Sequence, residues 1–281
     1  MPIVKMVKTN LLALACLSAP YNAVLTSAAC SRLVLQTALD DLFKTIEKPS
    51  APSVKLVSTV KISKNNAPVK SIAETGLRKF NGWAKPFRIT VLDDATCNVA
   101  AMSVPKYGNY TQILSTRMHI TPMGEVTELE VFVTGGDTNY IFFGNYLPDA
   151  PGEMWSEKNP APRTELLKSM DAYASAIAAG DGNQVKVAPD CSRYENGFKI
   201  GANLPEGQIG LGFGECNSGF ALIKVPVVGR RWYVDSETGV GLGNFMFSSA
   251  MWLHEYFKVR DGKIMQIYAG MQNGFRAPQD P

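Results

Sequence analysis

The chain has 281 residues, of which 46% are hydrophobic and 19% charged, with 24 glycines and 17 prolines. This composition is that of a globular protein and excludes a disordered, collagen-like or coiled-coil chain. The formal charge of +3 comes from 28 basic and 25 acidic residues. They form no dense basic block, so nucleic acid is not an expected partner.

The first 29 residues have the three parts of a secretory signal peptide. Lys5 and Lys8 precede an apolar run at 11–17, and small residues at 27–29 offer a cleavage site. The alternative is a disordered or amphipathic extension. The apolar run is far shorter than the roughly 20 residues of a membrane-spanning helix. We therefore expect a protein that is secreted or lies in the secretory-pathway lumen, without a membrane span.

Removal of this segment would take away Cys16 and leave an even number of cysteines, which predicts two disulfides in an oxidising compartment. Four cysteines allow three pairings. We favour the pairing that keeps each disulfide within one half of the chain, namely Cys30–Cys97 and Cys191–Cys216.

Further motifs bear on glycosylation, metals and cofactors. Asn109 begins the only glycosylation sequon, which agrees with secretion. The two histidines lie far apart in the sequence, so no metal site is expected. The glycines at 210–214 lack the dinucleotide-binding spacing, so no cofactor is expected, and those at 239–243 indicate a β-bulge.

An internal repeat organises the chain. Segments beginning at Arg32 and Arg163 both show the apolar spacing of an amphipathic helix. Aligned without a gap, Asp40 meets Asp171, and the register continues until Asn65 meets Asn196.

Alternating strands follow each helix. Residues 91–99 and 233–241 each predict a strand, an acidic turn and a second strand. Hairpins at 113–133 and 252–268 close the two halves, with glycines in matching turns. The order of elements predicts an α+β fold in which a curved, mostly antiparallel sheet wraps over an N-terminal helix.

We expect four segments along the chain. A proline-rich, non-helical linker at 144–162 separates the repeats. The division is then a signal peptide at 1–29, a first domain at 30–143, the linker, and a second domain at 163–281.

The second repeat resembles a known superfamily. Its helix ends in Ala-Gly-Asp181 and is followed by a strand that reaches Glu195-Asn-Gly, while His254-Glu-Tyr-Phe-Lys-Val begins a closing hairpin. These motifs are similar to those of the nuclear transport factor 2-like, or SnoaL-like, superfamily. More narrowly, residues 231–239 and 259–264 resemble a domain family of unknown function common in secreted fungal proteins. The resemblance implies two tandem cones of that superfamily.

The superfamily implies function only broadly, because it hosts isomerases, dehydratases, cyclases, epoxide hydrolases and binding modules. By resemblance to ketosteroid isomerase, Glu195 would be the acid/base, with Tyr173 and Glu255 as hydrogen-bond donors to an oxyanion. By resemblance to polyether epoxide hydrolases, Asp171 would be an acidic partner of Glu195.

Other residues have weaker assignments. His254 is a further catalytic candidate, but it neighbours Glu255 on one strand, so only one of the two can line the pocket. The aromatic residues expected to contact substrate are Trp232, Tyr233, Trp252 and Phe257.

The leading hypothesis is a cofactor-independent isomerase, cyclase, lyase or epoxide hydrolase that acts on a small hydrophobic natural product in secondary-metabolite biosynthesis. The alternatives are a non-catalytic binding protein that holds an apolar ligand, and a secreted effector. The first half would serve as an internal pseudo-dimer partner in a monomer, or the chain would form a homodimer.

Overall fold

The computed structural model describes residues 29–48, 54–108, 110–134, 150–200, 216–248 and 251–273. The predicted signal peptide, except its last residue, and Asn109 lie outside these ranges. No described helix is long and apolar enough to cross a membrane.

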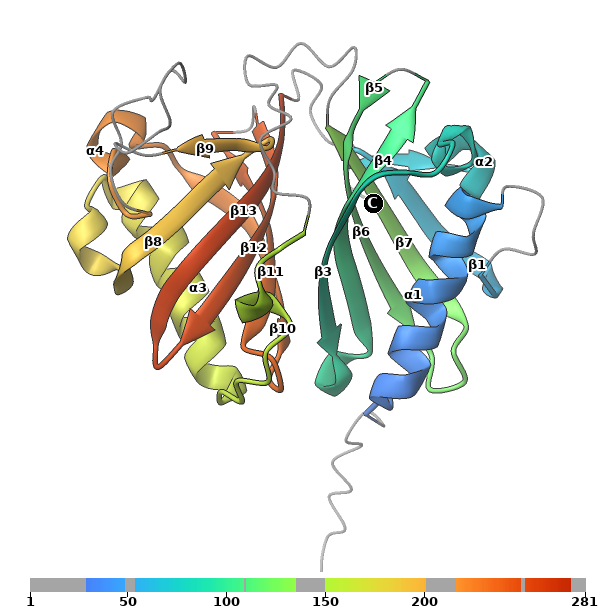
Figure 1. Ribbon diagram of the computed structural model, residues 1–281, viewed down its shortest axis with the longest axis horizontal. Helices are drawn as coiled ribbons and strands as arrows, with labels where there is room; N and C mark the ends of the chain where they lie inside the picture. The colour runs from blue at the N-terminus through green and yellow to red at the C-terminus, as the bar shows by residue number, and fades with distance from the viewer. Residues whose placement is uncertain are drawn as a thin grey trace, which may run out of the picture.

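The fold is α+β, with two mixed sheets and few helices (Figure 1). The elements of the first half are α1 (Arg32–Glu47), β1 (Leu56–Lys64), β2 (Ala67–Val69), α2 (Ile72–Thr75), η1 (Leu77–Lys79), β3 (Trp83–Asp93), η2 (Asp94–Thr96), β4 (Asn98–Tyr107), β5 (Tyr110–Thr111), β6 (Ile113–Ile120) and β7 (Val126–Thr134). Those that follow are η3 (Glu153–Trp155), α3 (Arg163–Ala179), η4 (Gly182–Gln184), β8 (Val187–Glu195), β9 (Phe198–Ile200), α4 (Phe220–Ile223), β10 (Val227–Asp235), β11 (Val240–Phe247), β12 (Met251–Arg260) and β13 (Lys263–Asn273).

The two halves share one strand order. The first sheet runs β2-β1-β7-β6-β4-β3, with β5 added to β4, and the second runs β10-β11-β12-β13-β8-β9. Read from β9 to β10, the second sheet has the same order of corresponding strands as the first, and only β5 has no counterpart. The first strand of each half pairs in parallel with the last, and the other pairs are antiparallel. The internal repeat is therefore a repeat of topology.

The long helices begin where the sequence predicts. Ser31 precedes α1 and its hydroxyl accepts a hydrogen bond from the Val34 amide, which satisfies one otherwise unpaired donor. Helix α3 ends at Gly180, whose φ of 71° lies in the left-handed region that favours glycine. Each helix buries its apolar face against its own sheet, so each half has a separate hydrophobic core.

One asparagine has the same role in both halves. Asn65 and Asn196 occupy left-handed turns with φ of 50° and 48°. The Asn65 side chain accepts a hydrogen bond from the Val133 amide at 2.8 Å, and Asn196 accepts one from the Met271 amide at 2.7 Å. Each asparagine thereby satisfies a backbone donor of the half's last strand. The sequence alignment of these residues reflects a shared structural function.

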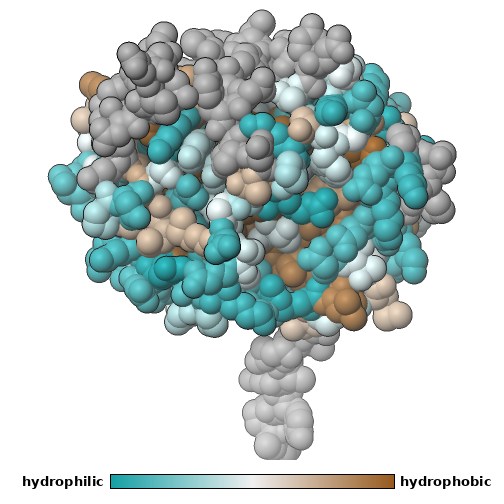
Figure 2. Space-filling model, viewed as in Figure 1, coloured by the Kyte–Doolittle hydropathy of each residue, from teal (hydrophilic) through white to brown (hydrophobic). Residues whose placement is uncertain are grey.

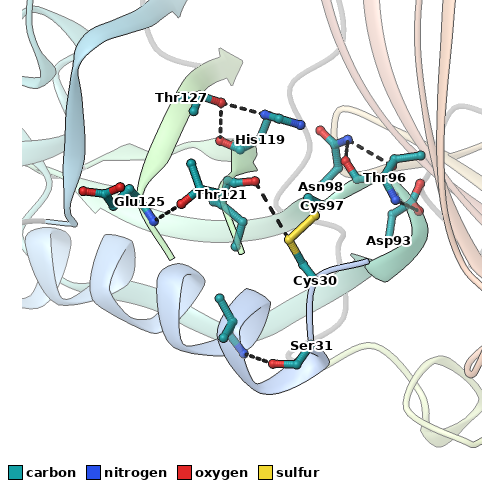
Figure 3. The surroundings of a disulfide bond; sticks show 12 residues. Cys30, Ser31, Asp93, Thr96, Cys97, Asn98, His119, Thr121, Glu125 and Thr127 are labelled. Carbon is teal, nitrogen blue, oxygen red and sulfur yellow. Dashed lines mark hydrogen bonds between the residues drawn. A yellow bond between two sulfur atoms is a disulfide. The ribbon is translucent and has the colours of Figure 1, made fainter. Parts of the chain in front are cut away.

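Both favoured disulfides are present. Cys30 and Cys97 join the start of α1 to the β3–β4 turn, with 5.1 Å between their Cα atoms (Figure 3). Cys191 and Cys216 tie β8 to the turn before α4. Such bonds reduce the number of conformations open to the unfolded chain. For loops of these lengths this stabilises the folded state by about 3–4 kcal/mol. Their presence is compatible with an extracellular or lumenal protein.

The two sheets pack against each other, with α1 and α3 on opposite outer sides (Figure 1). Alternate side chains of each strand therefore face the half's own helix or the other sheet. A third apolar cluster fills the space between the sheets and includes Phe87, Val91, Leu242, Tyr256 and Tyr268.

Two ion pairs cross between the halves in a reciprocal arrangement. Arg32 Nη1 contacts Asp235 Oδ1 at 2.7 Å, and Arg163 Nη1 contacts Asp93 Oδ1 at 2.5 Å. The alignment of the repeat places Arg32 over Arg163 and Asp93 over Asp235. Each helix thus begins with an arginine that binds the turn aspartate of the other half.

Backbone groups repeat the exchange. The Leu92 amide donates to Asp235 Oδ2 at 3.4 Å, and the Val234 amide donates to Asp93 Oδ2 at 3.1 Å. Both aspartates are buried. Each aspartate also accepts hydrogen bonds from backbone amides of its own turn. Because a buried charge requires an opposite charge as well as hydrogen bonds, the arginine from the other half completes each site.

Equivalent residues also meet between the sheets. Ser115 and His254 occupy matching positions of β6 and β12, and Ser115 Oγ lies 2.9 Å from His254 Nδ1. The His254 ring stacks on Phe132, with 4.3 Å between centroids. Phe132 lies over Gly270, its counterpart on β13, where a Cβ atom would come within 3.4 Å of the ring. These contacts mark an approximate twofold axis through the interface.

The described part of the linker does more than separate the halves. Trp155 in η3 is buried, its indole hydrogen-bonds to Gln266, and its ring centroid lies 5.2 Å from that of Tyr268. Residues 150–162 therefore pack on the second sheet, which the proline content alone did not predict. Residues 144–149 lie outside the described ranges.

The bulge predicted at 239–243 is wrong. Gly239 lies in the β10–β11 turn with φ of 68°, and the strand pairing continues without a shift through Gly241 and Gly243. A Cβ atom at Gly241 would lie 2.4 Å from Met170 Sδ, and one at Gly243 would lie 2.4 Å from the Trp232 ring. These glycines make room for large side chains packed against the strand.

We expect Asp235→Ala to destabilise the folded chain by about 2–5 kcal/mol, because it leaves Arg32 without this carboxylate and the Leu92 amide without its acceptor. Asp93→Ala should cost a similar amount through Arg163. The measurement is urea unfolding followed by circular dichroism. Asp41→Ala is the control, because its pair with Lys44 is surface-exposed and should contribute under about 1 kcal/mol. Equal losses in all three variants would contradict the prediction.

Candidate functional site

The second half contains a cluster of four polar side chains on the α3 side of its sheet, three of them buried and one partly buried. Tyr173 comes from α3, Arg193 and Glu195 from β8, and Glu255 from β12. Arg193 Nη1 donates to the Tyr173 hydroxyl at 3.4 Å and to the Cys216 carbonyl at 3.1 Å. Arg193 Nε lies 3.1 Å from Glu195 Oε1. The structure thus brings together the three residues aligned with ketosteroid isomerase.

Strand alternation decides which residue of the closing hairpin reaches the cluster. Glu255 faces α3, while His254 faces the first half, where it stacks on Phe132. Burial lowers the pKa of His254 to about 3, although Glu130 acts in the opposite direction. The imidazole is therefore neutral, and His254 is an interface residue outside the cluster.

The Glu255 carboxyl has unusual electrostatics. It is 1% exposed, and burial raises its pKa to about 8. Arg193 and the Tyr173 hydroxyl lower the pKa, while the Glu195 charge raises it further. Glu255 Oε2 has no hydrogen-bond partner among the described residues. At neutral pH the group is therefore mostly a neutral acid with capacity to donate or accept a hydrogen bond.

The other members of the cluster hold a fixed charge pattern. Burial, with Glu255 and Glu195 nearby, raises the pKa of the Tyr173 phenol well above its usual value, and Arg193 acts in the opposite direction. Arg193 is also buried, but its neighbours Tyr173 and Glu195 raise the pKa of the guanidinium. The cluster thus combines an ion pair, a neutral phenol and a neutral carboxylic acid.

The first half provides an internal comparison for this cluster. The matching positions there hold Leu42 for Tyr173, Ile62 for Arg193, Lys64 for Glu195 and Thr116 for Glu255. Leu42 and Ile62 belong to the apolar core of that half. The same topology therefore forms without the buried tyrosine, arginine and glutamate, so the fold does not require them.

The predicted substrate-contacting aromatics divide between the two faces. Phe257 packs against Tyr173 with 5.1 Å between centroids, and Trp232 packs against Phe245, so both lie on the α3 side. Tyr233 belongs to the cluster between the sheets. Trp252 lies two residues before His254 on β12, so its side chain is on the same face of the sheet, toward the first half.

Asp171 lies outside the cluster. Its side chain is 52% exposed, and Arg230 Nη1 contacts its Oδ1 at 3.0 Å. The helix periodicity explains this position, since Asp171 precedes Tyr173 by two residues and so points in another direction. The epoxide-opening pair of Asp171 with Glu195 has no support from this geometry.

Arg193 is the site residue that the sequence reasoning missed. It lies two residues before Glu195 on the same strand, so alternation places both side chains on one face. The strand pattern Cys191-Ser-Arg-Tyr-Glu195 contained this signal. The carbonyl that Arg193 binds belongs to Cys216, so the second disulfide also holds the arginine's acceptor in place.

A second buried polar group lies between the sheets. Glu130 of β7 accepts hydrogen bonds from Arg117 and from Arg231 of the other half. Burial alone would raise the pKa of Glu130, but the two arginines lower it to about 2. Arg117 also pairs with Glu128 at 2.7 Å, so two carboxylates balance the two arginines. Within the described residues no group of three histidine, cysteine, aspartate or glutamate side chains could hold a metal ion.

Residues 159–271 match a family described as a domain of unknown function (DUF8021). The matched region contains α3 and the strands of the second sheet except the last two residues of β13, and therefore the whole polar cluster. No curated protein matches the chain.

We expect the stability of the wild type to fall relative to Glu255→Gln as the pH rises from 5 to 8. The folded pKa near 8 lies above the unfolded value near 4.5, so the folded state binds the extra proton throughout this range. The stabilisation is complete below the unfolded pKa and is lost through the folded pKa, a change of about 3 kcal/mol.

Urea unfolding at several pH values measures this difference. The exposed Asp171→Asn change is the control and should follow the wild type at every pH. A constant difference between wild type and Glu255→Gln would show that Glu255 is not protonated in the folded protein.

Proposed function

We propose that both halves have the nuclear transport factor 2-like fold and that the second half carries a site for acid/base chemistry. A helix packed on a six-stranded sheet with a parallel first–last strand pair supports the fold proposal. The buried cluster of Tyr173, Arg193, Glu195 and Glu255 supports the second. The substrate class is a small hydrophobic natural product, and the chemistry uses no cofactor.

One observation carries the proposal: the buried Tyr173 and Arg193 occupy positions that the first half fills with the apolar core residues Leu42 and Ile62. Burying an arginine, a tyrosine and a glutamate costs stability unless their interactions compensate. The first half shows that the same topology forms without burying these three side chains. Groups retained against such a cost, with a strongly shifted pKa, are characteristic of functional sites.

The electrostatics of the cluster support Glu255, more than Glu195, as the proton-transferring group. Acid/base catalysis is most effective when the pKa of the group lies near the working pH, and the pKa of Glu255 is about 8. Glu195 instead forms an ion pair with Arg193. In this proposal Glu255 donates a proton to, or accepts one from, the substrate, while Tyr173 hydrogen-bonds to the oxygen on which charge develops.

The arginine–glutamate pair has a positioning role. Arg193 fixes the Tyr173 hydroxyl and is itself held by the Cys216 carbonyl. Burial is the main reason that the pKa of Glu255 is raised, and the Glu195 charge raises it further. The apolar residues around the cluster, among them Phe257 and Phe220, would exclude water and contact a hydrophobic substrate.

The test replaces the gene in a producing organism with a Glu255→Gln allele and compares small-molecule extracts by mass spectrometry. We expect one product to fall by about 10²–10⁴-fold, the usual loss on removal of an acid/base group. A precursor should accumulate that has the same mass or differs by one water. Isomerisation and cyclisation predict equal mass, whereas dehydration and epoxide hydrolysis predict the difference of one water.

An Asp171→Asn allele is the matched control, because it also neutralises a carboxylate of the second half but leaves the cluster intact. It should leave the profile unchanged. An unchanged profile for Glu255→Gln, with normal amounts of folded protein, would overturn the catalytic proposal and favour a non-catalytic binding protein.

A further inference from the structure

A cleft of about 230 Å³ lies where the two halves meet, away from the polar cluster. Its walls come from α1, from β3, from residues 151–156 and from the β10–β11 turn. The residues that bear on its chemistry are Arg32, Gln36, Arg88, Trp155, Asp235 and Thr238. Figure 2 shows the molecule in the orientation of Figure 1, with a mainly hydrophilic surface and only scattered apolar patches.

Arg88 gives the cleft an unneutralised positive charge. Its guanidinium lies over the Phe43 ring, 4.1 Å from the centroid, and 5.6 Å from the Trp83 centroid. Among the described residues it makes no hydrogen bond or ion pair. Burial lowers the pKa of Arg88, and Asp40 and Glu47 oppose this only through their charge. The guanidinium retains N–H donors for a ligand.

The equivalent arginine of the second half is neutralised. Arg230 lies five residues before Asp235, as Arg88 lies five before Asp93. Arg230 Nη1 contacts Asp171 Oδ1 at 3.0 Å and Ser175 Oγ at 2.8 Å. In the first half the aspartate matching Asp171 is Asp40, and its Oδ1 accepts a hydrogen bond from Gln36 at 3.0 Å. The same scaffold therefore pairs one arginine and leaves the other unpaired beside a cleft.

The remaining polar groups of the cleft do not cancel this charge. Arg32 forms ion pairs with two carboxylates: its Nη1 lies 2.7 Å from Asp235 Oδ1, and its Nε lies 2.8 Å from Glu237 Oε2. Thr238 Oγ1 is buried and has no hydrogen-bond partner among the described residues. Among the described residues, the cleft thus offers the Arg88 guanidinium and the buried Thr238 hydroxyl to a ligand, while the Trp155 indole forms part of its wall.

We propose that this cleft binds a small organic carboxylate, with Arg88 as the principal anion-binding residue. An apolar cavity of about 150 Å³ is known to hold benzene, so the space suits a molecule of about benzoate size. The planar guanidinium fork binds a carboxylate through two parallel hydrogen bonds. The ring of the ligand would contact Trp155, and the Thr238 hydroxyl would donate to a carboxylate oxygen.

The test is isothermal titration of the full chain with benzoate, with benzyl alcohol as a neutral molecule of similar shape, and with inorganic phosphate. We expect benzoate to bind and benzyl alcohol not to bind. Arg88→Gln should weaken benzoate binding by about 10–100-fold, the range for loss of a charge-assisted hydrogen bond. Thr238→Val should weaken it less.

Arg230→Gln is the matched control, because it removes the equivalent arginine of the second half, which does not line this cleft. It should leave benzoate affinity unchanged, as should Glu255→Gln, so this result is separate from the proposed catalysis. The proposal is overturned if benzoate does not bind, if it binds Arg88→Gln as well as wild type, or if benzyl alcohol binds equally. Arg88-dependent binding of phosphate alone would also overturn the carboxylate assignment.

Discussion

The exchange of charge between the two halves is the constraint on which the rest of the structure depends. Arg32 binds Asp235, and Arg163 binds Asp93, so each helix start is tied to the acidic turn of the other half. Both aspartates are buried and also accept backbone hydrogen bonds across the interface. Because an unpaired buried carboxylate is costly, the sheets are held face to face. That arrangement buries the aromatic cluster between them and forms the walls of the cleft at Arg88.

Because the two halves share one topology, residues at matching positions can be compared directly. Residues that recur with the same role, such as Asn65 and Asn196, serve the fold, since each satisfies a backbone donor of the half's last strand. Residues that differ at matching positions mark what the halves do separately. The second half has a buried tyrosine and a buried arginine where the first half has apolar core residues, and the first half has an arginine that lacks the partners of its counterpart. Both proposals rest on such differences in one chain.

Much of the fold could be predicted because its signals are local. The apolar spacing after Arg32 and Arg163 gave both helices, the matching glycine turns gave the closing hairpins, and the half-by-half distribution of cysteines gave the disulfide pairs. The candidate site was predicted in part: Tyr173, Glu195 and Glu255 do meet, but Arg193 was missed, and Asp171 and His254 lie elsewhere. The glycines of β11 do not form the predicted bulge, because they make room for Met170 and Trp232, which pack against that strand.

The sequence by itself determined the α+β class, the internal repeat, the order of elements within each half and the alternation that separates Glu255 from His254. These features depend on neighbours a few residues apart, or on periodicities of two and 3.6 residues. Only the tertiary structure decided how the halves face each other, which arginines lack a carboxylate partner, and how strongly burial shifts the pKa of Glu255. Those properties depend on distances between groups far apart in the chain and on the water excluded from around them, and no local pattern records either.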